Sequence, residues 1–467
     1  MTFSKVSVSS ELQAKVESFV QENFSLAVGD LGELVKIPGI AWPSFDPNNL
    51  NRSAEAVKNL LSATGLFDFV EIRTALKPNG EPGSPAVLAR RAAKNDAPHV
   101  LLYAHHDVQP PGNPELWESE PFQATLKGER LYGRGVSDDK AGVITHVYAL
   151  KSLAQLAGDV NLGITLFIEG EEEAGSESFS NFLADNRAEL AADLIIVADS
   201  GNWSIDTPAL TSTLRGVVSQ TFTLKTMDHA LHSGMFGGPL PDAMTAMVKL
   251  LATLNDEAGN VAVAGLKTVD VAELPFSDAD FREQAGLLDG VERIGTYSLL
   301  KQNWGAPAIT IIGLDAPAVA TSSNTAQPQI TARISMRLAP GEDPNHGLAM
   351  LREHLVAHAP YGAHIEFGHS EQGPGYFAKQ GWAAELAKEI LGRVWPEPAV
   401  EIGVGGSIPF ISEFATVFPE AEILVTGVED PDSRAHSPNE SQHLPTLKRA
   451  ITAEALLLLA GNQMRRS

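Results

Sequence analysis

Residues 99–110 read HVLLYAHHDVQP, an apolar run that leads directly into two histidines and an aspartate. The apolar run from His99 to Ala104 predicts a buried strand, and His105, His106 and Asp107 follow it at once. Alternate side chains of an extended strand point to the same face, so His105 and Asp107 share a face. A carboxylate there can accept the proton of one imidazole nitrogen and leave the other nitrogen free to bind a metal ion. We therefore predict a strand that ends in a candidate metal ligand.

Strand and helix patterns alternate along the neighbouring sequence. Apolar runs at 162–168 and 194–198 predict two more strands, and the stretch from Lys140 to Leu156 predicts a helix. This alternation is typical of an α/β sheet. Within the first ~30 residues, apolar side chains recur at helical spacing and predict an amphipathic helix.

The character of the sequence changes near Leu214. The Thr-rich stretch 217–226, a helical pattern at 243–254 and a candidate strand pair at 329–338 predict an α+β module. A helix at 382–394 and a strand at 423–426 then resemble the first region again. We predict an α/β fold in which a discontinuous domain with a mixed central sheet flanked by helices, residues 1–213 and 373–467, carries an inserted α+β domain, residues 214–372.

Composition excludes several classes of function. The chain has 467 residues, with 58 Asp and Glu against 34 Lys and Arg, and a formal net charge of −24. Clustered basic residues are absent from it, so nucleic acid and an anionic membrane are not expected as partners. There is no cysteine, which excludes disulfides and thiolate ligands. The N-terminal residues lack the apolar core of a signal peptide, and no uncharged apolar stretch reaches the length of a membrane span, so we expect a cytoplasmic protein.

Acidic residues and histidines gather at or just after the ends of the predicted strands, where open α/β sheets place their ligand sites. Asp138 and Asp139 precede the predicted helix, and Glu169, Glu171, Glu172 and Glu173 crowd the end of another strand. Carboxylates this close repel one another unless a cation lies between them. Two divalent cations need a bridging carboxylate and terminal ligands. The residues that supply this set are His105, Asp138, Glu173, Asp199 and His436, with Glu172 as a base.

Four motifs occur in the order found in a known family: YAHHDVQP, YGRGVSDDKAG, EGEEEAGS and AHSPNE. The chain resembles, from about residue 30 onward, the co-catalytic metallopeptidases that include carnosinase, cytosolic non-specific dipeptidase, aminoacylase, acetylornithine deacetylase and succinyl-diaminopimelate desuccinylase. The resemblance implies that Asp138 bridges two metals, that Glu173 and His436 complete one site, and that His105 and Asp199 complete the other. It also implies that Asp107 orients His105 and that Glu172 is the general base. His106 is the alternative metal ligand in this segment.

Three further segments resemble the dipeptidase branch of that family. The segment DHALHSGMFGG implies that His232 stabilises the oxyanion and reaches the partner subunit's site. ISMRLAP implies that Arg337 holds the substrate carboxylate, and GGSIP implies that Ser407 contacts the substrate. Asn324, in SSNTAQP, is a further candidate for holding the substrate. Relatives commonly have Arg-Glu before GGSIP where this chain has Gly403 and Val404, which leaves the side-chain preference open.

The resemblance implies a metal-dependent dipeptidase with two divalent cations per subunit. Zn²⁺ is the expected metal, and Mn²⁺ and Co²⁺ are the alternatives. The inserted domain is expected to act as a lid and as the interface of a homodimer. The alternative is an N-acyl amino acid amidohydrolase, such as succinyl-diaminopimelate desuccinylase or acetylornithine deacetylase. The same metal ligands would serve the hydrolysis of a peptide bond or of an N-acyl amide. A catalytically silent relative is the third hypothesis, and it is disfavoured because all ligands and the base are present.

Overall fold

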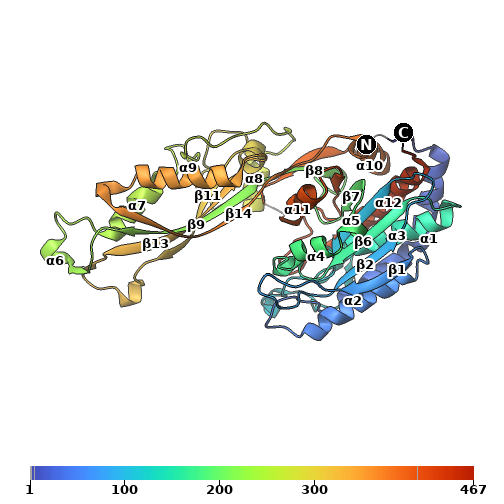
Figure 1. Ribbon diagram of the computed structural model, residues 1–467, viewed down its shortest axis with the longest axis horizontal. Helices are drawn as coiled ribbons and strands as arrows, with labels where there is room; N and C mark the ends of the chain where they lie inside the picture. Colours follow the sequence, from blue (N-terminus) through green and yellow to red (C-terminus); the bar gives the residue numbers. More distant parts are fainter. Residues whose placement is uncertain (1–2, 5, 407–408, 467) are drawn as a thin grey trace. The chain divides into compact units, whose positions relative to one another are not determined.

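The computed structural model describes residues 3–4, 6–406 and 409–466 (Figure 1). Contacts along the chain divide it into two compact units. Unit 1 comprises Met1–Ser212, Ala378–Ile402 and Glu413–Ser467. Unit 2 comprises Thr213–Phe377 together with the short segment Gly403–Ser412. In the described part of the chain, no helix has the length and apolar character needed to cross a membrane.

Unit 1 is built on a six-stranded mixed sheet in the order β1-β2-β6-β3-β7-β17. The strands are β1 (Phe69–Arg73), β2 (Ala86–Arg91), β3 (His99–His105), β6 (Gly163–Glu169), β7 (Leu194–Val197) and β17 (Glu422–Val425). Strand β3 runs parallel to β6 and β7, and β17 runs parallel to β7, whereas β2 is antiparallel to both of its neighbours. The predicted mixed central sheet is confirmed.

Helices cover this sheet because its strands are apolar on both faces. One face packs on a core to which five helices contribute: α1 (Ser10–Val35), α2 (Pro47–Ser62), α3 (Lys140–Leu156), α10 (Trp382–Val394) and α12 (Leu444–Gln463). Val100, Leu102 and Ala104 of β3 point into that core. On the other face, Tyr103 packs edge-on against Phe179 and Phe414. These two aromatic residues belong to α4 (Phe179–Asp185) and α11 (Pro409–Val417), and a short α5 (Arg187–Leu190) follows α4.

Two further sheets have three strands each. One is antiparallel and joins β4 (Thr125–Lys127), β5 (Arg130–Tyr132) and β18 (Ser441–His443). The other joins β8 (Ala209–Leu214), β15 (Tyr376–Phe377) and β16 (Val400–Val404). The pairing of β5 with β18 brings the segment after His436 beside the segment before Asp138.

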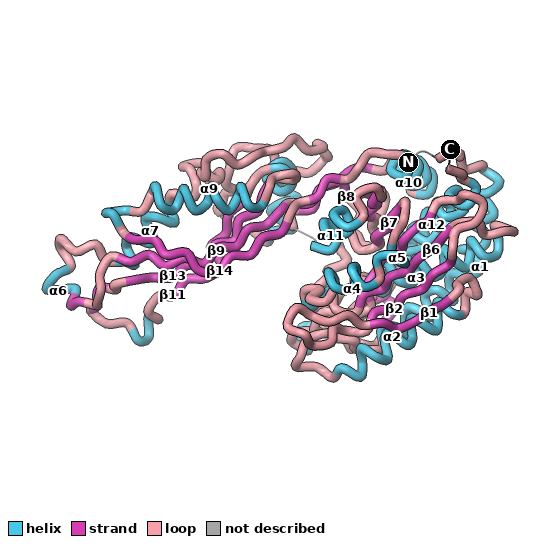
Figure 2. The backbone as a smooth tube through the Cα atoms, in the orientation of Figure 1, coloured by secondary structure: helices cyan, strands magenta, loops and turns pink. Residues whose placement is uncertain are grey.

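Unit 2 is an α+β unit with a four-stranded antiparallel sheet in the order β11-β13-β9-β14 (Figure 2). Its strands are β9 (Gly216–Lys225), β11 (Ala308–Asp315), β13 (Gln329–Leu338) and β14 (His364–Gly373). Its helices are α6 (Ser233–Phe236), α7 (Ala243–Ala252), α8 (Asp278–Ala285) and α9 (Pro344–Ala357), and β10 (Leu231–His232) pairs with β12 (Thr325–Ala326). The even-numbered side chains of β13 form a core with α7 and α9.

One local prediction is wrong. We expected a strand pair at 329–338, but the segment is the single ten-residue strand β13, and its partners β9 and β11 come from distant parts of the chain. The polar residues Thr331 and Ser335 lie on the half-buried face of this strand, where they alternate with buried apolar side chains.

Candidate metal centre

The carboxyl ends of three parallel strands of unit 1 bring the predicted ligands together. Strand β3 ends at His105, β6 ends shortly before Glu173, and β7 ends shortly before Asp199. Because parallel strands end at the same edge of a sheet, residues that follow them become neighbours. The N-terminus of α3 supplies Asp138, and the loop between β17 and β18 supplies His436.

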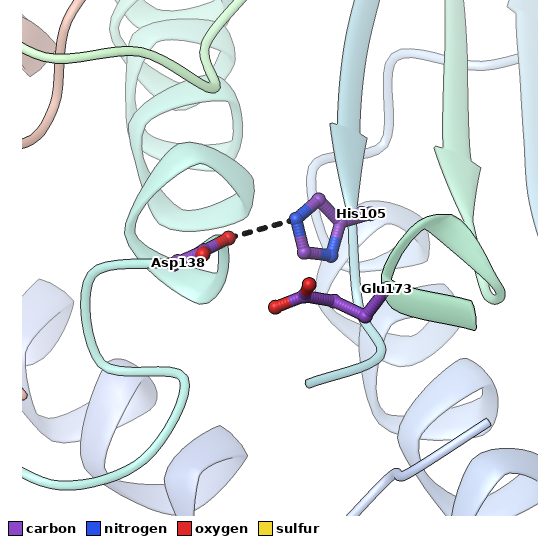
Figure 3. Close-up of side chains that lie close together, drawn as sticks. All are labelled: His105, Asp138 and Glu173. Atoms are coloured by element: carbon purple, nitrogen blue, oxygen red, sulfur yellow. Dashed lines mark hydrogen bonds and ion pairs between the residues drawn. The ribbon is translucent and has the colours of Figure 1, made fainter. Parts of the chain in front are cut away.

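Asp138 lies between two imidazole rings. Its Oδ1 is 2.9 Å from Nε2 of His105, and its Oδ2 is 2.9 Å from Nε2 of His436. Nε2 of His436 is also 3.2 Å from Oε2 of Glu173, and Nε2 of His105 is 3.9 Å from Oδ1 of Asp199. Figure 3 shows His105, Asp138 and Glu173 pointing toward one another. The structure therefore brings all five predicted ligands into one cluster.

The donor atoms fit a divalent cation. Potential ligand atoms of His105, Asp138 and Glu173 all lie within 4.8 Å of one another, and so do those of His105, Asp139 and Asp199. Imidazole nitrogen and carboxylate oxygen suit Zn²⁺, Mn²⁺ and Co²⁺. Each oxygen of Asp138 faces a different histidine, which is the arrangement that a carboxylate shared by two cations requires.

Asp139, the neighbour of Asp138, has a different task. It is the N-cap of α3: its Oδ1 accepts a 3.2 Å hydrogen bond from the N–H of Gly142, and its Oδ2 accepts a 3.1 Å bond from the N–H of His105. A Cβ at position 142 would lie 2.3 Å from Oδ1 of Asp139, so only glycine permits this approach. Asp139 thus ties the helix to the end of β3 and leaves Asp138 facing the histidines.

Asp107 lies behind the cluster and is fully buried. Its Oδ1 is 3.4 Å from Nδ1 of His105 and accepts a 3.2 Å hydrogen bond from the N–H of Glu172. Its Oδ2 accepts a 3.1 Å bond from the N–H of Glu173. The carboxylate of Asp107 thus fixes the backbone of both glutamates, and its Oδ1 together with the carbonyl oxygen of Asp107, 3.1 Å from Nδ1, orients the ring of His105, as a residue behind a metal ligand does. His106 is not brought into the cluster, because its Nε2 lies 2.8 Å from the carbonyl oxygen of Pro85.

The charges of the cluster perturb its members strongly. Burial raises the pKa of Asp199 to about 7, and the negative charges of Asp138 and Glu173 act in the same direction. Burial and the charge of Asp199 likewise raise the pKa of Glu172 well above its usual value. Hydrogen bonds to Asp138 and Glu173 raise the pKa of His436 to about 11. Such shifts mark a site where a cation would relieve the repulsion between carboxylates.

Two residues of this region escaped the sequence reasoning. Glu440 is fully buried and accepts hydrogen bonds from the backbone of the turn that carries Asp138. Glu429 has a buried Oε1 without a hydrogen-bond partner within the described residues, and burial together with Asp138 and Asp199 raises its pKa well above the usual value. Both residues flank His436 in one loop. Glu440 is the last residue of the AHSPNE motif, so this motif could have identified Glu440 from the sequence.

The predicted substrate residues belong to unit 2. His232 is exposed, and its Nδ1 accepts a 3.1 Å hydrogen bond from the N–H of Gly234. The carbonyl oxygen of Asn324 accepts a 2.9 Å bond from the N–H of Ser233, so the structure places Asn324 beside His232. Arg337 is half-buried on β13. Ser407 lies outside the described residues.

The chain matches known proteins over most of its length. Residues 101–460 match the model of peptidase family M20/M25/M40. A cysteinylglycine-S-conjugate dipeptidase of Corynebacterium striatum is 33% identical over 377 residues, which cover 78% of this chain and 81% of that protein. A Cys-Gly metallodipeptidase of Schizosaccharomyces pombe is 27% identical over 79% of this chain and 81% of its own. The fold is similar to that of human carnosine dipeptidase 1, with a TM-score of 0.75, 22% identity, and coverage of 98% of this chain and 100% of that one.

The chain belongs to peptidase family M20/M25/M40. The region that matches the family model extends from β3, which carries His105, into α12. The predicted family and the prediction of a peptidase are confirmed, and the relatives with the names given above lie in the dipeptidase branch.

Proposed function

We propose that this chain hydrolyses dipeptides and other short peptides with a water molecule activated between two divalent cations, and that Glu172 is the general base. The observation that carries the proposal is the position of Asp138, whose two carboxylate oxygens each lie 2.9 Å from a different imidazole. The names of the relatives from C. striatum and S. pombe support a dipeptide substrate over an N-acyl amino acid.

We assign the cations to the residues predicted from the sequence. Asp138 is shared, Glu173 and His436 complete one set of ligands, and His105 and Asp199 complete the other. When bound, two divalent cations supply Lewis acidity that polarises the scissile carbonyl and lowers the pKa of water. Zn²⁺ is the proposed metal, and Mn²⁺ and Co²⁺ fit the same donors.

Glu172 holds and moves the proton. It is half-buried, and its backbone N–H is fixed by Asp107 at 3.2 Å. In its ionised form the carboxylate accepts a proton from the attacking water, and the neutral acid that its raised pKa favours then returns this proton to the leaving amine. Such a general acid and base typically accelerates a reaction by ~10²–10⁴-fold. Asp107 contributes by fixing the positions of His105 and Glu172.

The functions of unit 2 and the assembly remain predictions from the sequence. We propose that Arg337 binds the substrate carboxylate, that His232 donates to the oxyanion, and that Asn324 and Ser407 contact the substrate. We also propose that residues 1–213 and 373–467 act as the catalytic domain and that residues 214–372 act as a lid and as the interface of a homodimer. The cytoplasmic location likewise stays a prediction.

The first experiment measures release of free amino acids from dipeptides and from N-succinyl and N-acetyl amino acids, with apo enzyme to which Zn²⁺, Mn²⁺ or Co²⁺ is returned. Metal-dependent cleavage of dipeptides is the expected result. Cleavage of N-acyl substrates alone would make the chain a deacylase, and inactivity with every metal would favour a catalytically silent relative.

A second experiment tests the base. Glu172→Gln is expected to lower kcat by ~10²–10⁴-fold while the chain still binds its metals. Glu177→Gln, at an exposed position of the same loop, is the matched control and should keep wild-type turnover. Wild-type turnover by a metal-loaded Glu172→Gln enzyme would overturn the assignment.

A further inference from the structure

The core of unit 1 contains a buried acid–base pair that none of the functions described above uses. His146 of α3 and Glu454 of α12 are both buried, and the two helices pack against each other. Nδ1 of His146 is 2.8 Å from Oε1 of Glu454, and Nε2 of His146 is 3.0 Å from the carbonyl oxygen of Tyr103. A carbonyl oxygen can only accept a hydrogen bond, so Nε2 carries a hydrogen atom and Nδ1 faces the carboxylate.

The two side chains share one proton between Nδ1 and Oε1. Burial acts to lower the pKa of His146, but the negative charge of Glu454 and the hydrogen bond to it outweigh burial and raise this pKa. Within the described part of the chain, neither residue has another ion-pair partner. Each therefore depends on the other, since a buried charge without a partner is costly. The shared proton also holds the ring in the form that donates from Nε2.

Three ligand-carrying segments meet at the carbonyl group of Tyr103. This group also accepts a 3.1 Å hydrogen bond from the N–H of Ala198, which extends the pairing of β3 with β7. Tyr103 lies two residues before His105, and Ala198 directly precedes Asp199. The imidazole itself belongs to α3, the helix that begins just after Asp138. One buried ring therefore contacts the point at which the segments that carry three proposed metal ligands come together.

We propose that His146 is a positioning residue of the metal centre. Its Nε2–H, kept in place by Glu454, holds the carbonyl group of Tyr103 against α3 and so fixes the ends of β3 and β7 relative to that helix. The ligands that these segments carry thereby keep the separations that two cations require. The inference rests on the proposed function, because it concerns the same metal centre, and it predicts an effect of the pair on metal binding beyond its effect on stability.

The test separates positioning from stability. In the double variant His146→Phe/Glu454→Leu, an apolar pair replaces the buried acid–base pair, a change that is often neutral or stabilising. The variant should therefore fold with a Tm close to that of wild type, but it lacks the donor to Tyr103. His146→Met/Glu454→Met takes its place if circular dichroism shows that the first double variant does not fold, because methionine adapts to irregular space.

The first measurement is the Kd for Zn²⁺ and Co²⁺, obtained by calorimetry on the full-length apo protein, together with the visible absorption spectrum of the Co²⁺-loaded protein. The double variant is expected to raise the Kd by about tenfold and to change the spectrum, which reports the geometry of the ligands. Thr145→Val, at a buried position of α3, removes only a hydrogen bond to the carbonyl oxygen of Ala141. It is the matched control and should keep the wild-type Kd and spectrum. The conservative variant Glu454→Gln should retain most of the affinity, because its amide can donate to Nδ1 and preserve the Nε2–H.

A wild-type Kd and spectrum in the folded double variant would overturn the inference. An equal rise of the Kd in Thr145→Val would also overturn it, since any buried change in α3 would then have the same effect. Turnover of a dipeptide at saturating metal adds a second readout: kcat of the double variant is expected to fall by about tenfold, whereas KM should not change, because the pair lies behind the ligands. If wild type binds metal but cleaves no dipeptide, the proposed function fails, and the Kd values still decide the role of His146.

Discussion

The backbone N–H of Asp138 donates a 3.1 Å hydrogen bond to Oε1 of Glu440, which lies 302 positions later in the chain. The same oxygen accepts a 3.0 Å bond from the N–H of Ser137, and Oε2 accepts bonds from the N–H of Gly135 at 3.0 Å and from Nη1 of Arg134 at 2.6 Å. One buried carboxylate thereby fixes the turn that carries Asp138. Because His436 lies four residues before Glu440, the same residue links the two segments that supply facing ligands.

Replacement of Glu440 by glutamine is expected to weaken metal binding. An amide offers one acceptor oxygen where the turn needs two, so Asp138 loses its fixed position, and residues behind metal ligands commonly contribute ~10–100-fold to affinity. The affinity for Zn²⁺ or Co²⁺ is measured by calorimetry. Glu397→Gln, at an exposed position, is the control.

Loss of the Glu440 charge also leaves Arg134 buried and unpaired, which costs about 3–5 kcal/mol of stability. The double variant Arg134→Gln/Glu440→Gln should regain part of that stability without regaining metal affinity. Wild-type affinity in a folded double variant would show that Glu440 does not position Asp138.

Asp107→Asn tests the residue behind His105 and the two glutamates. Asparagine keeps the shape but has one acceptor oxygen, so it cannot accept from the N–H of both Glu172 and Glu173. We expect kcat and metal affinity each to fall by about tenfold or more. Steady-state kinetics at saturating metal separates the two effects. Asp185→Asn, at an exposed position of α4, should leave both quantities unchanged.

In the metal-free protein, Asp199 is expected to lower stability as the pH rises. The folded-state pKa of Asp199, about 7, lies above its ordinary value of 3.8, so between those values this group holds more protons in the folded chain than in the unfolded chain. The contribution of Asp199 to the stability of the apo protein should therefore fall as the pH rises from about 4 to about 7, whereas the buried His99 acts in the opposite direction. Thermal unfolding of wild type and Asp199→Asn at a series of pH values isolates the contribution of Asp199 as the difference between the two proteins.

Asp199→Asn removes the repelled charge and should raise the Tm of the apo protein at pH 8, where wild-type Asp199 is ionised. It should also reduce the increase of Tm that added Zn²⁺ produces, since a proposed ligand is lost. An apo Tm that does not change on this substitution would contradict the repulsion inferred from the cluster.

His99 offers a test of acid stability away from the metal ligands. Its Nε2 lies 2.8 Å from Oγ1 of Thr165, and burial lowers the pKa of His99 to about 4. An unfolded histidine has a pKa of about 6.5, so below that value the unfolded chain binds more protons and the folded chain loses stability until the pH reaches about 4. Between pH 6.5 and pH 4, this effect of His99 lowers the free energy of unfolding by roughly 3 kcal/mol.

His99→Gln should flatten the fall of unfolding free energy between pH 6.5 and pH 4, measured by urea denaturation. His364→Gln, at an exposed position of β14, should leave the wild-type slope. Equal slopes in wild type and His99→Gln would rule out this source of acid sensitivity.

The sequence predicts those features that depend on local periodicity. The apolar run before His105 identifies β3 to within one residue, and the pattern from Lys140 to Leu156 matches α3. Strand alternation also places His105 and Asp107 on one face, and the structure brings them within 3.4 Å of each other.

Features that depend on distant partners escape such reasoning. The structural role of Asp139 is one such feature, because its Oδ2 accepts a hydrogen bond from the N–H of His105, 34 positions earlier. Glu440 accepts hydrogen bonds from backbone N–H groups, and these contacts cannot be predicted from the types of the residues that donate them. The segment 329–338 is one strand and not a strand pair, because its partners β9 and β11 lie in distant parts of the chain. Its own residues do not indicate which strands it pairs with.

The parallel pairing of β17 with β7 affects how the chain acquires its fold. All of unit 2's main segment separates Val197 from Glu422, so the edge of unit 1's sheet closes only after that segment has been synthesised. Closing so long a loop carries an entropic penalty and slows the pairing of strands. On the ribosome, unit 2 can complete its antiparallel sheet while β7 of unit 1 still lacks its partner strand β17. His436 follows the main segment of unit 2 in the sequence, so a nascent chain cannot assemble the full set of ligands before that segment has been synthesised.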